Sequence, residues 1–109
     1  MDIVMELPAN LLKTWTVKSF EIRGVKTFLD KWADFTFRED GSVDYCYYNS
    51  NKQVVKSSLH KLSCENGIYT IYEGNRKQWT IDKISENELM LANDLRNMIY
   101  HCIVSDKTD

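Results

Sequence analysis

The residues best suited to chemistry in this sequence are tyrosines, because each combines an apolar ring with a hydroxyl that donates or accepts hydrogen bonds. Tyr45 and Tyr47 stand two positions apart, and Tyr72 and Tyr100 follow in later segments. A buried tyrosine needs a hydrogen-bond partner, which water or a ligand can supply. The rings either interlock as a core or line a small, partly wet pocket. The number of hydroxyls favours a pocket that orients a small amphipathic ligand.

Groups that carry catalysis or bind metals are few. His60 and His101 are the only histidines. His60 and Cys64 on one strand would lie about 13 Å apart, and the neighbours His101 and Cys102 would point to opposite faces. The sequence contains no P-loop, nucleophile elbow or dinucleotide fingerprint. We therefore predict a non-catalytic protein without metal or cofactor. A Cys–His pair across strands stays open, but no motif supports it.

Cysteine usage and the start of the chain bear on the compartment. Cys46, Cys64 and Cys102 form an odd set without a Cys-x-x-Cys pair. Such a set is typical of small buried hydrophobic residues in a reducing compartment. A Cys46–Cys64 disulfide with Cys102 free is the second interpretation. Because no signal-peptide pattern follows Met1, we predict a cytoplasmic protein, or a periplasmic or secreted one if a leader was removed.

Length and composition indicate a single folded domain. The chain has 109 residues, of which 43% are hydrophobic and 28% charged, with one proline and four glycines. These values predict one globular domain over 1–109, with an N-terminal arm at 1–11 and a C-terminal tail at 105–109. No apolar run reaches the ~18–20 residues of a membrane span. A net charge of -2 and a pI of about 5.7 argue against nucleic acid as a partner.

Apolar and polar residues alternate with period two from residue 12 onward, which indicates β-strands. In the segment DFTFREDGSVDYCYY, residues 34–48, Phe35 and Phe37 share one face and precede an Asp40-Gly41 pair. Asp-Gly and Asn-Gly pairs are strong hairpin signals. We therefore predict an aromatic-faced hairpin here and a second hairpin at Asn66-Gly67.

Two segments depart from simple alternation. The parity of the apolar residues changes once within 12–22, which predicts a β-bulge near Lys18–Ser19. Between 24 and 33 the apolar residues are spaced by three, one and three, an amphipathic-helix pattern. We therefore predict a short helix or lid segment near residues 24–33. The residues of this pattern are Val25, Phe28, Leu29 and Trp32.

The segments add up to an all-β protein with about eight strands joined by short turns. Parallel strands need crossover connections of about a dozen residues or more, and the connections here are mostly shorter. The sheet is therefore predicted to be an antiparallel meander. Closure into a barrel would remove its two exposed edges.

The order of motifs resembles the small bacterial lipocalin-like domains, distant relatives of the lipocalin and fatty-acid-binding barrels. The motifs are TWTV at 14–17, FTFREDGSV at 35–43, QWTIDKISENELML at 78–91 and a final YHCIV at 100–104. The resemblance covers roughly residues 12–104. It implies a small lipocalin-like barrel that holds an apolar or amphipathic molecule.

The resemblance also assigns a role to Trp15, because an inward tryptophan at this place closes the barrel floor in the family. Lipocalins usually carry Gly-x-Trp in this strand, whereas Lys13 stands where that glycine would be. The chain is also shorter than a lipocalin, which argues against a large cavity. An eight-stranded barrel has room for interlocked side chains or for one small ligand.

Alternation and resemblance together give the residues expected to face the barrel interior and, among them, the expected ligand contacts. The expected inward residues are Trp15, Val17, Phe35, Phe37, Val43, Tyr45, Tyr47, Ile68, Tyr72, Trp79, Ile81, Leu89, Leu91 and Tyr100. The expected ligand contacts are Trp15, Phe37, Tyr45, Tyr47, Tyr72, Trp79 and Tyr100.

Two alternatives to a binding barrel start from the same aromatic residues. A protein-interaction domain, such as an inhibitor, immunity-type or assembly factor, would use its outer surface and an unidentified protein partner. Its expected contacts are the outward rings Tyr48 and Tyr69 and the segment around Phe28 and Trp32. An OB-type nucleic-acid binder would use Phe35, Phe37, Tyr45 and Tyr47 as stacking platforms, but the acidic pI opposes it.

Overall fold

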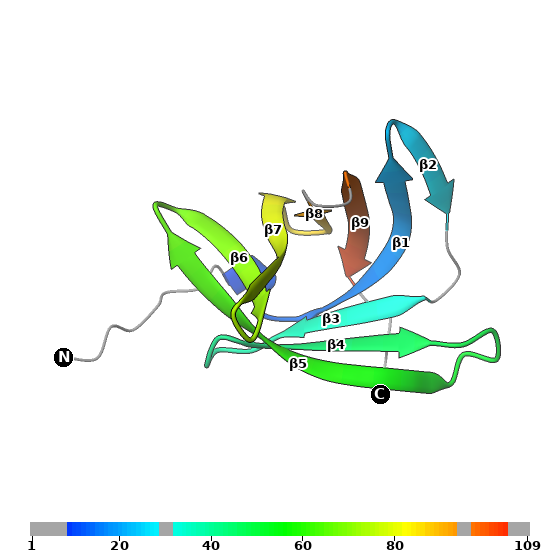
Figure 1. The fold of residues 1–109 in the computed structure, drawn as a ribbon, viewed down its shortest axis with the longest axis horizontal. Helices are drawn as coiled ribbons and strands as arrows, with labels where there is room; N and C mark the ends of the chain where they lie inside the picture. Colours follow the sequence, from blue (N-terminus) through cyan, green and yellow to red (C-terminus); the bar gives the residue numbers. More distant parts are fainter. Residues whose placement is uncertain (1–8, 29–31, 94–96, 105–109) are drawn as a thin grey trace.

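The computed structural model describes residues 9–28, 32–93 and 97–104. This part of the chain is a single turn of 3-10 helix followed by nine strands (Figure 1). The elements are η1 (Ala9–Leu11), β1 (Thr14–Ile22), β2 (Val25–Phe28), β3 (Ala33–Phe37), β4 (Ser42–Tyr48), β5 (Val54–Glu65), β6 (Ile68–Glu73), β7 (Arg76–Ile84), β8 (Glu88–Asn93) and β9 (Met98–Val104).

The strands form one antiparallel sheet that closes on itself. Its order is β2-β1-β3-β4-β5-β6-β7-β8-β9, and an additional pairing joins β1 to β9. Eight strands therefore make a closed barrel, while β2 pairs only with β1. The prediction of a closed antiparallel barrel is confirmed, with one strand more than expected.

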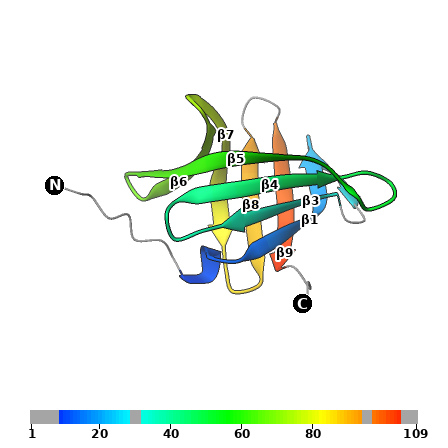
Figure 2. The same cartoon turned by 90° about the horizontal axis from the view of Figure 1, so that it is seen from below.

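The barrel is flattened into two walls that cross. In Figure 1, β3, β4 and β5 run side by side, and β7, β8, β9 and β1 rise from them. Figure 2 shows β3, β4 and β5 crossing in front of β7, β8 and β9 at a steep angle. Side chains from both walls therefore meet in the interior.

Strand β1 belongs to both walls, and the predicted bulge lies within it. Its pairing with β9 shifts register between Val17 and Ser19, which confirms the bulge near Lys18–Ser19. On its other edge, Thr14–Thr16 pair with β3, whereas Ser19–Ile22 pair with β2. Beyond the bulge, β1 therefore pairs with β2 and no longer with β3.

The helix predicted near residues 24–33 is wrong where the structure describes that segment. Val25–Phe28 form strand β2, and residues 29–31 lie outside the described residues. Arg23 and Gly24 both have positive φ, 51° and 82°, so the chain reverses in a tight turn and runs back along β1. Val25 and Phe28 of the apolar pattern do not reach the core, because all four residues of β2 are exposed.

Turn chemistry sets the register of the hairpins, as the sequence predicts. Asn66 and Gly67 have φ of 54° and 79°, the two positive values of a type I′ turn. Gly41 has φ of 87° and is the last residue of the turn that joins β3 to β4. In that hairpin Phe35 lies opposite Tyr45, and Phe37 lies opposite Val43.

Buried side chains from most strands of the barrel form the core. Trp15 is fully buried, and its indole N–H donates a hydrogen bond to the carbonyl oxygen of Leu11 at 3.2 Å. Leu11, in the segment predicted as an arm, is also fully buried. Trp15 therefore faces the interior, as the resemblance implies, and its role in closing the barrel floor stays a prediction. The other buried apolar residues are Val17, Ala33, Phe35, Phe37, Val43, Tyr45, Leu62, Ile71, Trp79, Leu89, Leu91, Tyr100 and Cys102.

Strand β6 turns the opposite set of side chains inward from the predicted one, which included Ile68 and Tyr72. Ile71 is fully buried and lies opposite Trp79, whereas Ile68 is 54% exposed. Tyr72 is half-buried and is not part of the core, and Tyr69 packs against the core although it was expected to point outward. The cause is parity, because the Asn66-Gly67 turn puts Tyr69 and Ile71 on the inner face.

The outer face of the barrel holds one buried acid. Asp34 is 4% exposed and accepts hydrogen bonds from the hydroxyls of Thr16 at 2.8 Å and Tyr48 at 2.6 Å. Tyr48, expected as an exposed outward ring, is half-buried and held in this network. It contributes to stability through a bond to a charged acceptor, which is worth about 1.5–3 kcal/mol.

The three cysteines are free. Cys46 lies opposite Ser57, and Cys64 lies seven residues further along β5, roughly 23 Å away at strand rise. A disulfide needs Cα atoms within about 7 Å, so the Cys46–Cys64 bridge is wrong. Only Cys102 is buried, and burial raises the pKa of its thiol.

Candidate functional site

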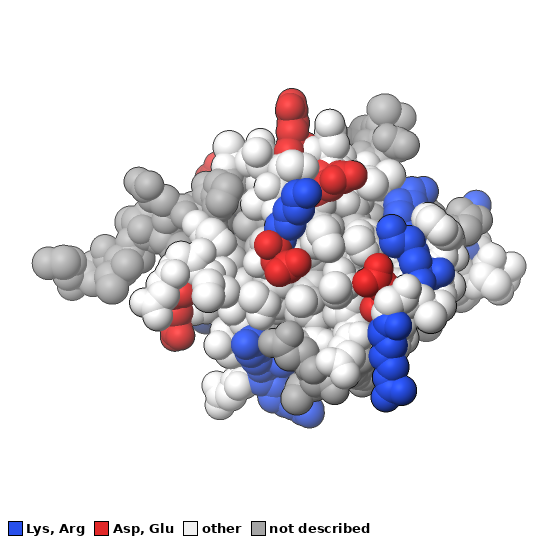
Figure 3. Space-filling model, turned by 90° about the horizontal axis from the view of Figure 1, so that it is seen from above, with Lys and Arg blue, Asp and Glu red and all other residues white. Residues whose placement is uncertain are grey.

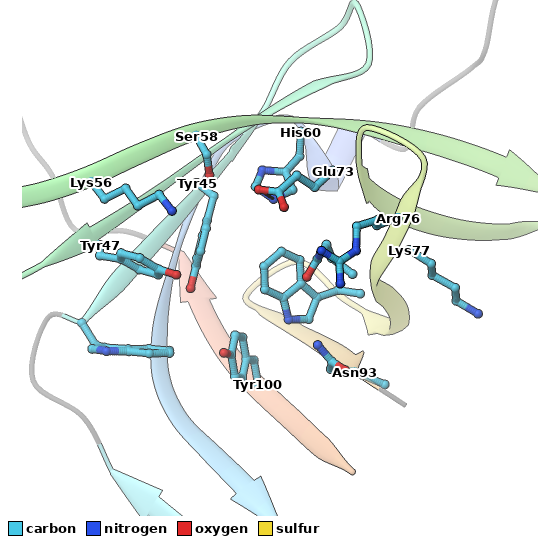
Figure 4. A pocket seen from close by; sticks show the side chains of 14 residues that line it. Tyr45, Tyr47, Lys56, Ser58, His60, Glu73, Arg76, Lys77, Asn93 and Tyr100 are labelled. Atoms are coloured by element: carbon cyan, nitrogen blue, oxygen red, sulfur yellow. Dashed lines mark ion pairs between the residues drawn. The ribbon is translucent and has the colours of Figure 1, made fainter. Parts of the chain in front are cut away.

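A cavity of about 720 Å³ opens beside the core. Its volume lies within the ~300–1,000 Å³ typical of small-molecule sites. The cavity is lined by Trp32, Tyr45, Tyr47, Lys56, Ser58, His60, Glu73, Arg76, Lys77, Gln78, Trp79, Ala92, Asn93 and Tyr100 (Figure 4). The lining combines aromatic rings with charged and amide groups, so the cavity has an apolar wall and a polar wall.

Alternate residues on β4 and β5 build one side of the cavity. Tyr47 lies opposite Lys56, and Tyr45 lies opposite Ser58. His60 follows two positions further along β5. Because successive strand residues point to opposite faces, Lys56, Ser58 and His60 all face inward. Antiparallel pairing of two hairpin-linked strands thus places rings and polar groups next to each other.

Five rings from four segments form a continuous aromatic surface. The centroid of Trp79 lies 5.1 Å from that of Tyr45 and 5.9 Å from that of Tyr100. The Trp32 ring packs edge to face against Tyr100, with ring centroids 5.5 Å apart, and stacks on Tyr47, with ring centroids 6.2 Å apart. These separations fall in the range of favourable ring pairs, worth about 0.5–1.5 kcal/mol each beyond burial. The rings hold one another in place and present flat faces to a ligand.

Three phenol groups converge at the base of this surface. Burial raises the pKa of Tyr45 far above its usual range, and the hydroxyls of Tyr47 and Tyr100 add to the shift by proximity and hydrogen bonding. Tyr45 therefore stays neutral. Figure 4 shows the Tyr45 and Tyr47 hydroxyls directed toward each other, with Tyr100 below them. This cluster can both donate and accept hydrogen bonds toward a polar ligand group.

His60 and Asn93 are the buried polar residues of the cavity lining, and His60 is the more buried of the two. It is 4% exposed, and its ring packs against Tyr45 at 5.9 Å and Trp79 at 5.6 Å. Its Nε2 lies 3.8 Å from a carboxylate oxygen of Glu73. Burial lowers the pKa of His60, and the attraction of Glu73 only partly opposes the shift. His60 is therefore neutral at pH 7.

The lowered pKa of His60 predicts a pH dependence of stability. In the unfolded chain a histidine takes up a proton near pH 6.5, whereas the folded protein resists this proton down to lower pH. The free energy of unfolding should therefore fall as the pH drops from 7 to 5. Replacing His60 with Gln removes this contribution, so the fall should be smaller in the variant. Chemical denaturation at both pH values measures it, and an equal or larger fall in His60→Gln would contradict the assignment.

Some buried polar atoms of the cavity lining have no hydrogen-bond partner among the described residues. They are His60 Nδ1, Trp79 Nε1 and Asn93 Oδ1. A buried polar group without a partner costs about 1–3 kcal/mol, and such groups call for an explanation by water, ion or ligand. Three of them along one cavity indicate that a polar molecule fits there.

The sequence-predicted site residues divide into two sets. Tyr45, Tyr47, Trp79 and Tyr100 line the cavity. Trp15 and Phe37 are buried in the core and do not line it, and Tyr72 lies outside both core and cavity. For these three residues, direct ligand contact stays a prediction from the sequence with no support from geometry.

Sequence reasoning missed the polar half of the site. Lys56, Ser58 and His60 face inward, while Leu59 on the same strand is 67% exposed. Strand β5 thus turns polar side chains inward and an apolar side chain outward, which is the opposite of the usual pattern. The signal that could have found the polar half is Leu62, which shares their parity and is buried. Trp32, predicted in a helix, instead packs against Phe20, Tyr47 and Tyr100 just before β3.

Searches for other kinds of site give two negative findings. Within 9–28, 32–93 and 97–104, no group of three or more His, Cys, Asp or Glu side chains could hold a metal ion. In the same part of the chain, no helix has the length and apolar character needed to span a membrane.

Comparison with known proteins identifies the fold. No family model matches the sequence, and no curated protein matches it. A lipocalin-like protein from Bacteroides uniformis superposes with a TM-score of 0.71 over 89% of this chain and 100% of its own, at 13% identity. An uncharacterised protein from Bacteroides eggerthii gives a TM-score of 0.67 over 87% and 99%, at 10% identity.

The class of protein that these likenesses define is the lipocalin-like β-barrel. The chain has this fold, which confirms the fold implied by the resemblance read from its motifs. At such identities the likeness concerns the fold alone, so the function has to be argued from the cavity.

Proposed function

We propose that this protein is a non-catalytic binding protein that holds a small amphipathic molecule in its barrel. The observation that carries the proposal is the cavity of about 720 Å³, in which an aromatic surface faces polar groups. Apolar pockets with a few placed polar groups are the usual form of small-molecule sites. The rings would hold the apolar part of the ligand, and the tyrosine hydroxyls, His60 and Asn93 would orient its polar part.

The residues behind the two alternative functions are mostly buried or half-buried. Tyr48 bonds to Asp34, and Tyr69 and Trp32 pack against the core, so of the four residues expected to contact a protein partner only Phe28, 77% exposed, is an exposed side chain. The burial of Phe35 and Phe37 also argues against their use as a stacking platform for nucleic acid. On the face seen in Figure 3, Lys and Arg side chains lie in separate groups, with neutral and acidic side chains between the groups. A single basic surface, typical of nucleic-acid binders, is not present on that face.

A cavity-filling substitution tests the proposal. N-phenyl-1-naphthylamine (NPN) is a neutral amphipathic dye whose fluorescence rises in apolar surroundings. Ser58 is half-buried in the cavity wall, so Ser58→Phe should fill the space and weaken NPN binding roughly tenfold or more. Titration of the dye into wild type and variant measures the affinity.

The matched control is Ser57→Phe, which adds the same ring one position away on the outer face of β5, where Ser57 is exposed. It should leave NPN affinity unchanged. If wild type does not bind NPN, or if both variants weaken binding equally, the cavity is not the site and the proposal fails.

A further inference from the structure

We propose that the ligand is an aromatic organic anion, whose negative group is met by Lys56 and Arg76 at the two sides of the cavity. This inference rests on the proposed function and names the chemistry of its ligand. It covers aromatic carboxylates, sulfonates and phosphate esters, because these share a flat apolar body and a negative group.

The charges of the lining carry the first step. The protein has a net charge of -2, yet three cationic side chains and one acidic side chain line the cavity. The acid, Glu73, lies by His60 with 3.8 Å between the nearest atoms. Neither Lys56 nor Arg76 forms an ion pair within the described part of the chain. The cavity is thus locally positive in an acidic protein, and such focusing attracts anions.

The directions of these side chains carry the second step. Figure 4 shows Lys56 reaching in from β5 and Arg76 from the start of β7, on opposite sides of the cavity, whereas Lys77 points away. Lys56 lies beside the Tyr45 and Tyr47 hydroxyls in this view. A negative group between the two cations would therefore also meet neutral O–H donors, and charge-assisted hydrogen bonds are stronger than neutral ones.

The aromatic surface carries the third step and separates an organic anion from a free inorganic one. Trp32, Tyr47, Trp79 and Tyr100 line the same space as the cations. Flat rings stack favourably on such side chains, whereas inorganic phosphate has no apolar part to bury. Both Lys56 and Arg76 are exposed, so salt should weaken the preference for an anion.

A matched pair of dyes tests the inference. 8-Anilino-1-naphthalenesulfonate (ANS) has the ring system of NPN plus a sulfonate. Wild type should bind ANS about tenfold more tightly than NPN at low salt, and the Lys56→Gln/Arg76→Gln double variant should lose this ratio, because its affinity for ANS falls more than its affinity for NPN. Lys61→Gln removes a cation from the outer face of the same strand, next to the outward Tyr72, and should keep the ratio. Millimolar inorganic phosphate should not displace ANS.

The outcomes separate this inference from the proposed function. If NPN binds in the cavity and ANS binds no more tightly, the binding function stands and the anion preference is wrong. An equal loss of the ratio in Lys61→Gln, or displacement of ANS by inorganic phosphate, also overturns the preference. If neither dye binds, the proposed function itself is contradicted.

Discussion

Replacing Trp15 with alanine is expected to lower the free energy of unfolding by about 3–5 kcal/mol, the cost of removing a fully buried aromatic side chain. Trp15 is 0% exposed, and its indole N–H bonds to the carbonyl of Leu11, which is buried with it. The substitution therefore opens a void in the core and removes one of the two hydrogen bonds to that carbonyl, which also accepts one from the backbone N–H of Lys13. Small domains are stable by only about 5–15 kcal/mol in total, so the variant should be marginal. Urea denaturation followed by circular dichroism measures the change.

The matched control is Leu59→Ala, which also shortens an apolar side chain but at a position that is 67% exposed. Surface substitutions of this kind usually change stability by less than about 0.5 kcal/mol. A loss of less than about 1 kcal/mol in Trp15→Ala would show that Trp15 does not stabilise the core, contrary to its burial.

Replacing Trp79 with leucine is expected to weaken NPN binding roughly 10- to 100-fold, because central aromatic residues dominate binding energy at well-packed sites. The Trp79 ring contacts Phe35, Tyr45, His60 and Tyr100 and also lines the cavity. Leucine keeps an apolar side chain in the core, so the variant should stay folded. Dye titration gives the affinity, and circular dichroism verifies the fold.

The control for this substitution is Phe28→Leu, which removes a ring from the exposed strand β2. It should leave the affinity for NPN unchanged. Should Trp79→Leu bind NPN as tightly as wild type while folding normally, the aromatic surface would not be the ligand's contact.

Local signals in the sequence predict most of the barrel wall. Hairpins at Asp40-Gly41 and Asn66-Gly67 follow from residues that tolerate positive φ, and the bulge at Lys18–Ser19 follows from a change of parity. These features depend on neighbours in the chain, so a single sequence reveals them.

Features that depend on distant partners are the ones missed. The helical spacing of Val25 and Phe28 is real, but a two-residue turn at Arg23-Gly24 binds this segment to β1 as a strand. Strand β6 has apolar residues of both parities, so only its pairing with β7 shows that Ile71 is inside and Tyr72 is not.

The polar half of the cavity could not be predicted for a related reason. Hydrophobic patterning assumes that strands turn their apolar side inward. Strand β5 breaks this assumption, because Lys56, Ser58 and His60 face the cavity and Leu59 faces out. Tyr45 and Tyr47 could be placed correctly because their strand follows the ordinary pattern. The polar residues on the inner face of β5 therefore add to the site what the aromatic residues of β4 alone did not reveal.

The most direct measurement for the central claim is a crystal structure of the protein with saturating NPN. The account predicts the dye inside the barrel, with its rings against Trp79 and Tyr100 and its amine near the tyrosine hydroxyls. Dye bound instead on the exposed apolar residues of the outer face, Val55 and Leu59, with only water in the cavity, would contradict it.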